Sequence, residues 1–400
     1  MRLPLLAAAT VLSGALAVPA AVPAFADSAP PAAAAPYSAA AHRPGVADHA
    51  AWKKALDDLV AAGVPGVIAE VHDAHGTWTG TSGRGDVHHR QLPSVDGRFR
   101  AGSNTKTFVA TTVLQLVAEK KVRLDTPIER YLPGLVPNGQ HITVRQLLSH
   151  RSGLFDYTDS LWHGNLSELY QTRFRHWTPP QLLAEAFRHA PYFAPGTAGH
   201  YSNTNYIVLG MLIQKVTGKS TEQEITDRLI KPLGLHHTSF PGSSVRIPGP
   251  HAHGYLRMNG PGSPYTDITE ESMSWASTAG SLISTTHDLN RFFSALIGGK
   301  LLPPALLHQM QDAQPLQNGA TDYGLGLSRL TDPSYGTAYG HIGSAPGYNT
   351  YSFTTADNSR QVTLSLNVLI DSQKLKTATN KALKTLLRPT ATPEHARPGR

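Results

Sequence analysis

Cysteine is absent from the 400 residues of this chain. A chain without cysteine cannot form a disulfide bond, a cysteine-bound metal site or a thiol nucleophile, so its fold must be stabilised by an apolar core. After its first residues the sequence also lacks any apolar run close to the ~20 residues that a membrane helix needs. We therefore expect a mature chain without a membrane span.

Several catalytic motifs are missing as well. No serine has glycine at both second-nearest positions, which excludes the G-x-S-x-G elbow of α/β-hydrolases. The sequence has no G-x-x-x-x-G-K-[ST] loop for nucleotide phosphates and no H-E-x-x-H zinc motif. Among its 20 histidines, His251 with His253 and His236 with His237 are the alternative to consider for a metal, but no carboxylate pattern accompanies them. We expect no metal, no cofactor and no nucleic-acid partner.

The two ends of the chain differ in composition from the rest. Residues 1–26 contain a basic start, an apolar run and the triplet Ala24-Phe25-Ala26, which is typical of a secretory signal peptide with its cleavage site. Residues 27–43 are rich in alanine and proline and predict a disordered leader, and residues 388–400 predict a flexible tail. We therefore expect a secreted protein with one folded domain at 44–387.

The chain is basic, with a formal net charge of +7 and a pI near 9.5. Such a charge suits attraction to a polyanionic cell wall, but it also serves solubility alone. The basic residues are scattered and do not form blocks, so the sequence leaves both interpretations open.

A serine and a lysine stand three residues apart in the segment Phe99 to Lys106. Residues at i and i+3 share one face of a helix, so the hydroxyl of Ser103 and the amine of Lys106 can meet. A desolvated, neutral lysine can remove the proton of a serine as that serine attacks a carbonyl. Ser103 could instead only cap the helix that follows it. This S-x-x-K motif occurs once in the chain.

Two later motifs favour the catalytic interpretation. Tyr201-Ser202-Asn203 is the only Y-x-N in the sequence and precedes an apolar run. His341-Ile342-Gly343-Ser344 lies far downstream, at the start of an alternating segment typical of a sheet strand. Taken singly, these residues could be turn residues and an ordinary strand histidine.

Together, the order and spacing of the three motifs resemble the superfamily of penicillin-binding proteins and class C β-lactamases, which are serine hydrolases. Within it, the chain is most similar to secreted D-alanyl-D-alanine carboxypeptidases of actinomycete type. The resemblance covers nearly all of the mature chain and includes four further segments, Ile142–Leu154, His200–Ile213, Ser274–Thr285 and Tyr323–Leu327.

The resemblance implies an α/β fold of the β-lactamase/transpeptidase type. Its antiparallel sheet is built from both ends of the chain and flanked by helices, with an all-helical lobe inserted at about 111–275. The residue patterns agree, because 67–72, 77–81 and 361–370 predict strands and 371–387 predicts a closing helix. We also expect a monomer.

The resemblance further implies the roles of the catalytic residues. Ser103 would form the acyl-enzyme and Lys106 would take its proton. Tyr201 would relay protons to the leaving group and later to water, assisted by the lysine, because a free phenol has a pKa of about 10. Asn203 would bind the substrate amide and orient Lys106. His341 replaces the lysine of the K-T-G triplet found in many relatives, as is usual in this carboxypeptidase branch.

The remaining implied residues bind substrate. Gly343 would let the strand approach the substrate, and the backbone amides of Ser103 and Ser344 would form an oxyanion hole. Trp162 and Trp275 stand where relatives line the cleft with aromatic side chains, although large aromatics are as often part of a core.

Two departures from the carboxypeptidase pattern concern the substrate. This branch holds the terminal carboxylate of its peptide with hydroxyls on the His-x-Gly strand and an arginine after Gly-Leu-Gly-Leu. Here Ile342 replaces the threonine and Ser328 replaces the arginine, with Arg329 one place further on and on the opposite face of a strand. Only Ser344 keeps its hydroxyl.

These departures leave several functions open. The leading hypothesis is a D-alanyl-D-alanine carboxypeptidase that acts on cell-wall peptides and is acylated by β-lactams. An esterase, a D-amino-acid amidase or aminopeptidase, or a β-lactamase would use the same catalytic residues. A penicillin sensor that is acylated and then stops is a further alternative.

Overall fold

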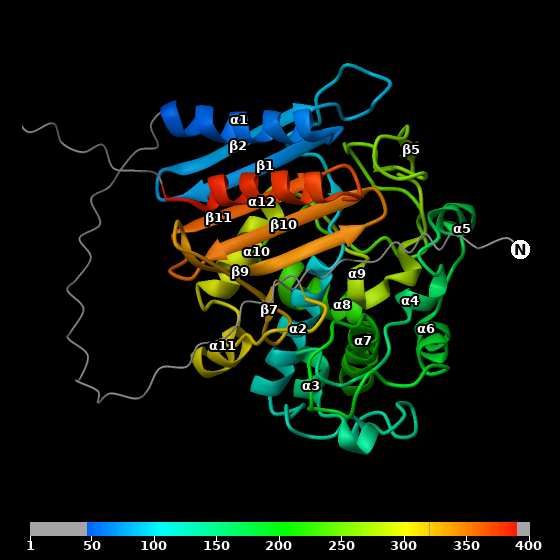
Figure 1. Ribbon diagram of the computed structural model, residues 1–400. Helices are drawn as coiled ribbons and strands as arrows, with labels where there is room; N and C mark the ends of the chain where they lie inside the picture. Colours follow the sequence, from blue (N-terminus) through cyan, green and yellow to red (C-terminus); the bar gives the residue numbers. More distant parts are fainter. Residues whose placement is uncertain (1–45, 320, 390–400) are drawn as a thin grey trace, which may run out of the picture.

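A seven-stranded antiparallel sheet forms the centre of the molecule in the computed structural model, which describes residues 46–319 and 321–389 (Figure 1). The predicted signal peptide, the leader and the tail from residue 390 onward lie outside the described residues. In spatial order the strands are β2 (Gly76–Gly83), β1 (Gly66–Asp73), β11 (Arg360–Leu366), β10 (Tyr348–Thr355), β9 (Gly336–Ala345), β8 (Ser328–Asp332) and β7 (Asp322–Tyr323).

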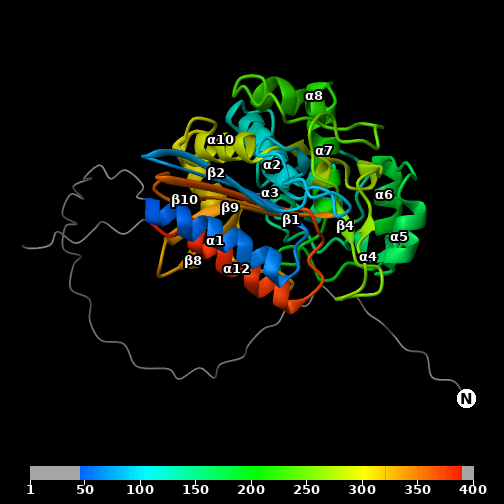
Figure 2. The ribbon, with the colours of Figure 1, turned by 90° about the horizontal axis from the view of Figure 1, so that it is seen from above.

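One face of the sheet is covered by the two terminal helices, α1 (Val46–Ala62) and α12 (Gln373–Leu387) (Figure 2). The Ser372 side chain accepts a hydrogen bond from the Leu375 amide and so caps the start of α12. Leucines at helical spacing then face the sheet, where they join one buried apolar cluster with Trp52 of α1.

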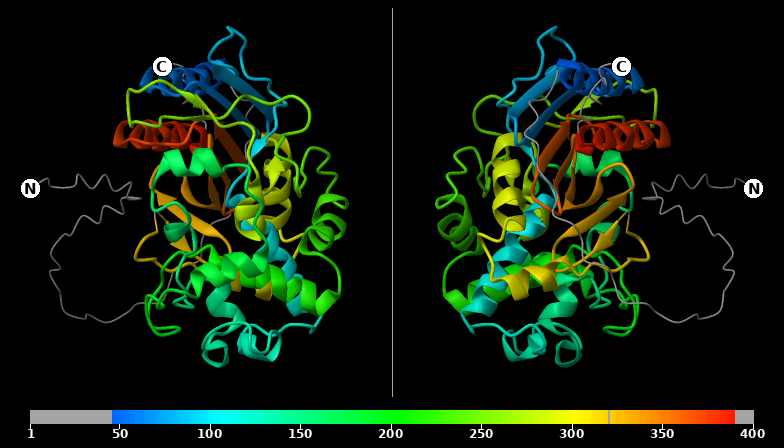
Figure 3. Two further views of the ribbon diagram at one scale, coloured as in Figure 1. Left: turned by 90° about the vertical axis from the view of Figure 1, so that its right-hand side faces the viewer. Right: turned by 90° about the vertical axis from the view of Figure 1, so that its left-hand side faces the viewer.

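The other face of the sheet carries α10 (Thr286–Ile297), which contacts β1, β10 and β11. In Figure 3, α10 (yellow) and α12 (red) lie on opposite sides of the orange strands. Helix α2 (Asn104–Ala118) lies between the sheet and the lobe and contacts both β9 and α7 (Thr204–Thr217). It is buried along almost its whole length, which fixes the position of its first turn.

The lobe is made of short helices and turns. Its remaining helices are η1 (Ile128–Arg130), η2 (Gly139–His141), α3 (Val144–Leu148), α4 (Thr158–Leu161), α5 (Leu166–Thr172), α6 (Pro179–Ala186), α8 (Thr221–Ile225) and η3 (Thr226–Ile230). The chain then returns to the sheet through η4 (Met273–Trp275), α9 (Ser277–Gly280) and α11 (Pro304–Gln311). Two small ribbons pair β3 (Phe99–Arg100) with β6 (Ile283–Ser284) and β4 (Tyr255–Leu256) with β5 (Thr266–Asp267).

The predicted fold class is confirmed, and the strands and closing helix stand where the patterns placed them with small shifts. Strand β11 ends at Leu366, four residues before the predicted end at Ile370. The side chain of Asn367 accepts a hydrogen bond from the Gly66 amide at 2.6 Å, and the Ile370 amide donates to the side chain of Asn349. Side-chain acceptors replace ladder bonds here, so the strand ends.

Strand β9 has a free edge at its C-terminal half. Its pairing with β8 ends at Gly340 opposite Ser328, whereas its pairing with β10 continues to Ala345. Residues 341–345 therefore leave one set of backbone donors and acceptors without a neighbouring strand. In the described part of the chain, no helix is both long and apolar enough to cross a membrane.

Candidate active site

Ser103 directly precedes α2 and Lys106 lies in its first turn, both just after a tight turn through Gly102. Gly102 has a φ of +54°, and a side chain there would lie 2.6 Å from the Ser344 amide nitrogen, so only glycine fits. Ser103 precedes α2 directly and its side chain makes no capping hydrogen bond. The capping alternative is thus not what the structure shows. Ser103 is partly exposed, whereas Lys106 is fully buried.

The amine of Lys106 is surrounded by three oxygen atoms. Nζ lies 3.0 Å from Ser103 Oγ, 2.7 Å from Asn203 Oδ1 and 2.7 Å from the carbonyl oxygen of Ala279. Burial lowers the pKa of Lys106 from 10.5 to about 7, although the charge of Asp156 opposes this shift. A neutral amine has two protons, which the amide oxygen and the carbonyl accept, so its lone pair is left for the Ser103 hydroxyl.

Asn203 is held between Lys106 and a buried carboxylate. Its Oδ1 accepts from Lys106, and its Nδ2 donates to Asp156 at 2.9 Å and lies 3.3 Å from Thr158 Oγ1. Asp156 also accepts from the Asn203 backbone amide at 3.0 Å, and burial raises the pKa of Asp156. The predicted orienting contact with Lys106 is present. Both amide hydrogens of Asn203 face acceptors within the protein, so its predicted contact with the substrate stays a prediction.

Tyr201 closes the cluster on the side of the helical lobe. The Ser103 side chain lies close enough to its phenol to influence the pKa of Tyr201, and Lys106 Nζ lies 4.9 Å from the centre of its ring. Burial raises the pKa of Tyr201 well above 10, so the phenol keeps its proton at neutral pH. The ring of His150 packs against that of Tyr201, with the centroids 4.1 Å apart. Tyr201, Ser103 and Lys106 therefore share one site.

His341 is buried and hydrogen-bonded away from Tyr201. Its Nδ1 lies 2.7 Å from the carbonyl oxygen of Ile342, and its Nε2 lies 2.8 Å from the hydroxyl of Tyr323. Burial and the nearby charge of Lys106 lower the pKa of His341 to about 3, so the ring is neutral. A neutral ring that donates from Nδ1 must accept at Nε2, so Tyr323 is the donor. This leaves Lys106 as the cation nearest to Tyr201 in the cluster.

Gly343 and Ser344 lie on the free edge of β9. A side chain at 343 would lie 1.9 Å from the carbonyl oxygen of Ala101, so glycine is needed for this close approach. The contact brings the Ser344 backbone against Gly102, next to the start of α2. The amides of Ser103 and Ser344 are thus on adjoining segments, as an oxyanion hole requires.

Trp162 and Trp275 form one aromatic pair beside the end of β9. Their rings meet edge to face at 5.0 Å, and both side chains are half-buried. Trp162 donates from Nε1 to Thr172 at 3.1 Å, and Trp275 packs with Met273 and Ala345. The pair thus stands at the rim of the site and not in either large core.

Ile342, Ser328 and Arg329, at or next to the positions where the carboxypeptidase branch holds a substrate carboxylate, do not form such a binding site here. Ile342 packs into the apolar cluster under α1 and α12, on the far face of the sheet from His341. Ser328 is buried, and Arg329 donates to Asp322 at 2.7 Å. The one arginine near this position therefore already has a carboxylate partner.

Three residues of the site were missed by the sequence reasoning: Asp156, His150 and Tyr323. His150 and Tyr323 lie in segments that carried the family resemblance, where they received no role. His150 accepts at Nδ1 from the Ser202 amide at 3.1 Å, directly after Tyr201. Asp156 has no local motif at all, and only the fold brings it to Asn203.

The histidine pairs lie elsewhere. His251 and His253 face a surface pocket, and His237 is hydrogen-bonded to Arg98. In the described residues, no group of three or more histidine, aspartate or glutamate side chains is placed to hold a metal ion.

The chain belongs to the beta-lactamase family, whose profile matches residues 52–385. Among sequence relatives, penicillin-binding protein 4 of Amycolatopsis lactamdurans is 30% identical over 76% of this chain and 81% of its own length. The putative penicillin-binding protein PbpX of Bacillus subtilis is 29% identical over 72% of this chain and 66% of its own, just under two thirds. The serine hydrolase superfamily expected from the motifs is confirmed.

Solved structures add a second group of relatives. The D-stereospecific amidohydrolase of a Streptomyces species is 38% identical, with a TM-score of 0.75 over 82% of this chain and 98% of its own. The D-amino acid amidase of Ochrobactrum anthropi SV3 is 30% identical, with a TM-score of 0.76 over 85% of this chain and 98% of its own. A penicillin-binding protein homologue from Pyrococcus abyssi, described as octameric, shares the fold at 24% identity. The expected monomer stays a prediction.

Proposed function

We propose that this protein is a D-stereospecific serine acyl hydrolase that cleaves amides and esters of D-amino acids or of peptides ending in one. The observation that carries the proposal is the buried amine of Lys106, 3.0 Å from the Ser103 hydroxyl and with a pKa of about 7. A base of this pKa is half-deprotonated at neutral pH, where it works best. The stereospecific class is supported by the similarity to the two amidohydrolases.

In the acylation step, the Ser103 oxygen attacks the substrate carbonyl and its proton passes to Lys106. The backbone amides of Ser103 and Ser344 stabilise the negative oxygen of the tetrahedral intermediate. When the bond to the leaving group breaks, Tyr201 gives its proton to the departing amine or alcohol, and Lys106 returns a proton to Tyr201. Lys106 and Tyr201 then have their starting protonation states.

Deacylation reverses these roles with water in place of the leaving group. As water attacks the ester of Ser103, it gives a proton to the Tyr201 oxygen while Tyr201 passes its own phenol proton to neutral Lys106. Lys106 then returns a proton to the Ser103 oxygen as that oxygen leaves, so both groups regain their starting protonation states. His341 is neutral and bound to Tyr323, so we assign it the positioning of this side of the cleft and not a charge.

The leaving-group side favours substrates without a free carboxylate. Ile342 lies on the other face of the sheet and Arg329 is paired with Asp322, so no free cation of the predicted grip remains. An unpaired carboxylate loses a charge-assisted hydrogen bond that is worth roughly 1.5 to 3 kcal/mol. An amide or ester carries no such cost.

The second candidate is the D-alanyl-D-alanine carboxypeptidase predicted from the motifs, with β-lactams as acylating ligands. Its support is the similarity to penicillin-binding proteins. The signal-peptide pattern at residues 1–26 supports export, and a peptide of the cell wall would then be within reach. A β-lactamase and a penicillin sensor share the same acylation step and differ in deacylation.

The test compares one peptide with its C-terminus either blocked or free. Release of D-alanine amide or D-alanine methyl ester from the blocked acetyl-D-Ala-D-Ala is measured beside release of D-alanine from the free acid. The proposal expects the blocked substrates to be cleaved at least tenfold faster in kcat/KM, as one lost charge-assisted bond implies. A preference for the free acid would make the carboxypeptidase the correct assignment. Cleavage of the L-alanine counterpart at the same rate would contradict the D-stereospecificity.

A further inference from the structure

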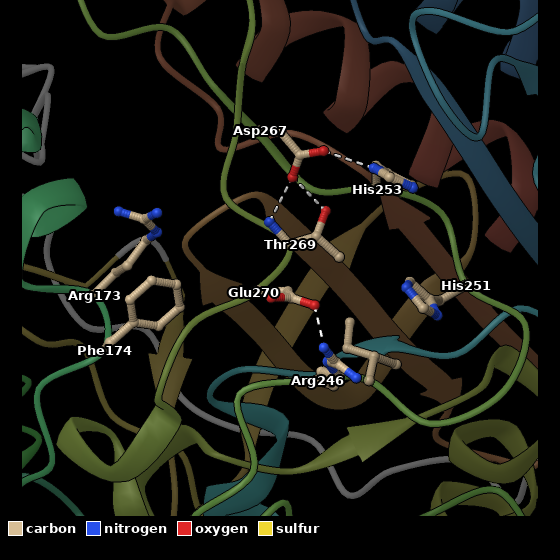
Figure 4. Close-up of a pocket in the computed structure, with 9 residues that line it drawn as sticks. Arg173, Phe174, Arg246, His251, His253, Asp267, Thr269 and Glu270 are labelled. Atoms are coloured by element: carbon tan, nitrogen blue, oxygen red, sulfur yellow. Dashed lines mark hydrogen bonds and ion pairs between the residues drawn. The ribbon is translucent and has the colours of Figure 1, made fainter.

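A cavity of about 440 Å³ opens on the surface outside the Ser103 cluster. Its walls come from two distant parts of the chain, the end of α5 and the loops around β4 and β5. Figure 4 shows the charged lining residues, with Asp267 bonded to His253 and Thr269, and Glu270 bonded to Arg246. The lining residues are Arg173, Phe174, Arg246, Ile247, His251, His253, Asp267, Thr269 and Glu270.

The pocket contains two carboxylates, each with a basic partner, and one further arginine. Asp267 accepts from His253 at 2.6 Å, and Glu270 accepts from Arg246 at 3.0 Å. Arg173 differs, because in the described residues the ion pairs of the pocket join Glu270 to Arg246 and Asp267 to His253, and Arg173 takes part in neither. Within the described residues, its guanidinium donates from Nη1 to the carbonyl oxygen of Tyr170 at 2.6 Å. Arg173 is therefore the charge in the pocket that lacks an opposite charge.

Arg173 is nevertheless held in place. Its guanidinium lies over the rings of Tyr170 at 4.0 Å and Phe174 at 4.3 Å. Such stacking fixes the plane of the guanidinium while leaving N–H donors free for a carboxylate. The ring of Phe174 is 50% exposed, and Ile247 is buried, so the pocket also offers apolar surface.

The pocket lies at the end of the free edge of β9. The turn after β9 places the Gly347 backbone against Gly254 and the side chain of Ile268. These two residues are the direct neighbours of the lining residues His253, Asp267 and Thr269. Ser344, at the proposed oxyanion hole, is three residues before Gly347, and residues 346 and 347 form the turn from β9 to β10, so the two residues are at most roughly 10 Å apart. A peptide paired with this edge would reach the pocket within two or three residues.

We propose that this pocket is a subsite for a carboxylate side chain on the acyl side of a peptide substrate, at the third residue counted back from the scissile bond, with Arg173 as its partner. The inference rests on the proposed function, because it places a peptide along β9 with its reacting carbonyl at Ser103. It adds that the preferred substrates are peptides with an acidic residue at that place.

The test uses two substrates that differ in one charge, acetyl-Glu-Gly-D-Ala methyl ester and acetyl-Gln-Gly-D-Ala methyl ester. The wild type is expected to prefer the glutamyl substrate by about tenfold in kcat/KM. In Arg173→Gln the ratio of the two rates should fall to about one, and in Arg173→Lys part of it should remain. Because each ratio is taken within one variant, a general loss of activity cancels.

Arg175→Gln is the matched control. Arg175 is a nearby arginine that stacks on Trp177 at 3.8 Å and does not line the pocket. Its variant should keep the full preference for the glutamyl substrate. A wild-type ratio of one, or a preference that survives in Arg173→Gln, would overturn the subsite.

A binding measurement separates this proposal from the proposed function. Calorimetry of Ser103→Ala with acetyl-Glu-Gly-D-Ala amide and acetyl-Gln-Gly-D-Ala amide measures peptide binding without turnover. Tighter binding of the glutamyl amide, lost in the double variant Ser103→Ala, Arg173→Gln, supports the subsite even if no ester is cleaved by the wild type. Turnover of D-alanine methyl ester together with equal binding of both peptides would keep the function and overturn the subsite.

Discussion

Two polar regions of this molecule handle charge in opposite ways. At the Ser103 cluster, Lys106 and His150 are fully buried and His341 is 2% exposed. In the pocket at Arg173, the side chains of Arg246 and Glu270 are 79% and 51% exposed. Burial lowers the pKa of Lys106 to about 7 and that of His341 to about 3, whereas the guanidinium of Arg246 lies in contact with water.

The difference separates chemistry from recognition. A base must be able to lose its proton near neutral pH, and a dry, closed site makes the charged amine costly. A charge that selects a substrate must stay ionised, which an open pocket allows. The comparison therefore predicts large effects on the rate at the buried cluster and modest effects on substrate choice at the pocket.

The largest effect is expected from Ser103→Ala. Removing the hydroxyl should abolish turnover and covalent labelling by a β-lactam or fluorophosphonate probe, because no other serine contacts Lys106 in the described residues. Intact-protein mass spectrometry measures the label, and the melting temperature, unchanged because Ser103 makes no capping bond, serves as the control. Full labelling of the variant would show that another residue is the nucleophile.

Tyr201→Phe should follow, with kcat reduced by roughly 10² to 10⁴, the usual range for a lost general acid or base. The ring and its packing on His150 remain, so substrate binding should change less than the rate. Single-turnover acylation measures the step directly. An acylation rate equal to that of the wild type would remove Tyr201 from the proton path.

His150→Asn should lower kcat by about 10², because a misplaced general acid loses most of its effect. His150 holds the Tyr201 segment through the Ser202 amide and through its ring, and asparagine is too short for both contacts. Asparagine tolerates the φ of +57° at this position, so the backbone is not strained. KM should change little, and a KM effect without a kcat effect would show that His150 serves binding.

Much of the fold follows from local patterns in the sequence. The alternation of apolar residues predicts β1 and β2, and the helical spacing of leucines predicts α12. The end of β11 was predicted too late, because Ile370 continues the apolar pattern. What ends the strand is the contact of Asn367 with Gly66, which is 301 residues away in the sequence.

Residues of the site could be predicted from the sequence only where they belong to a recognisable motif. Ser103 and Lys106 share a helical face, so their contact follows from spacing, whereas the meeting with Tyr201 was expected from the family resemblance alone. Asp156 reaches Asn203 by a contact over 47 residues that no spacing rule describes. The pairing of His341 with Tyr323 likewise depends on how β9 lies beside β7 and β8.

The central claim is that burial holds Lys106 ready to act as the base of Ser103. The most direct test is the pH dependence of kcat/KM for a D-amino-acid ester, which reports ionisations of the free enzyme. The neutral amine is the active form, so the rate should rise with pH through one ionisation near 7 and then stay level up to about pH 9. Tyr201 and His341 should add no step between pH 5 and 9, since their pKa values lie well above 10 and about 3. A rate that is flat across this range, or that rises only near pH 10 where an ordinary lysine titrates, would contradict the account.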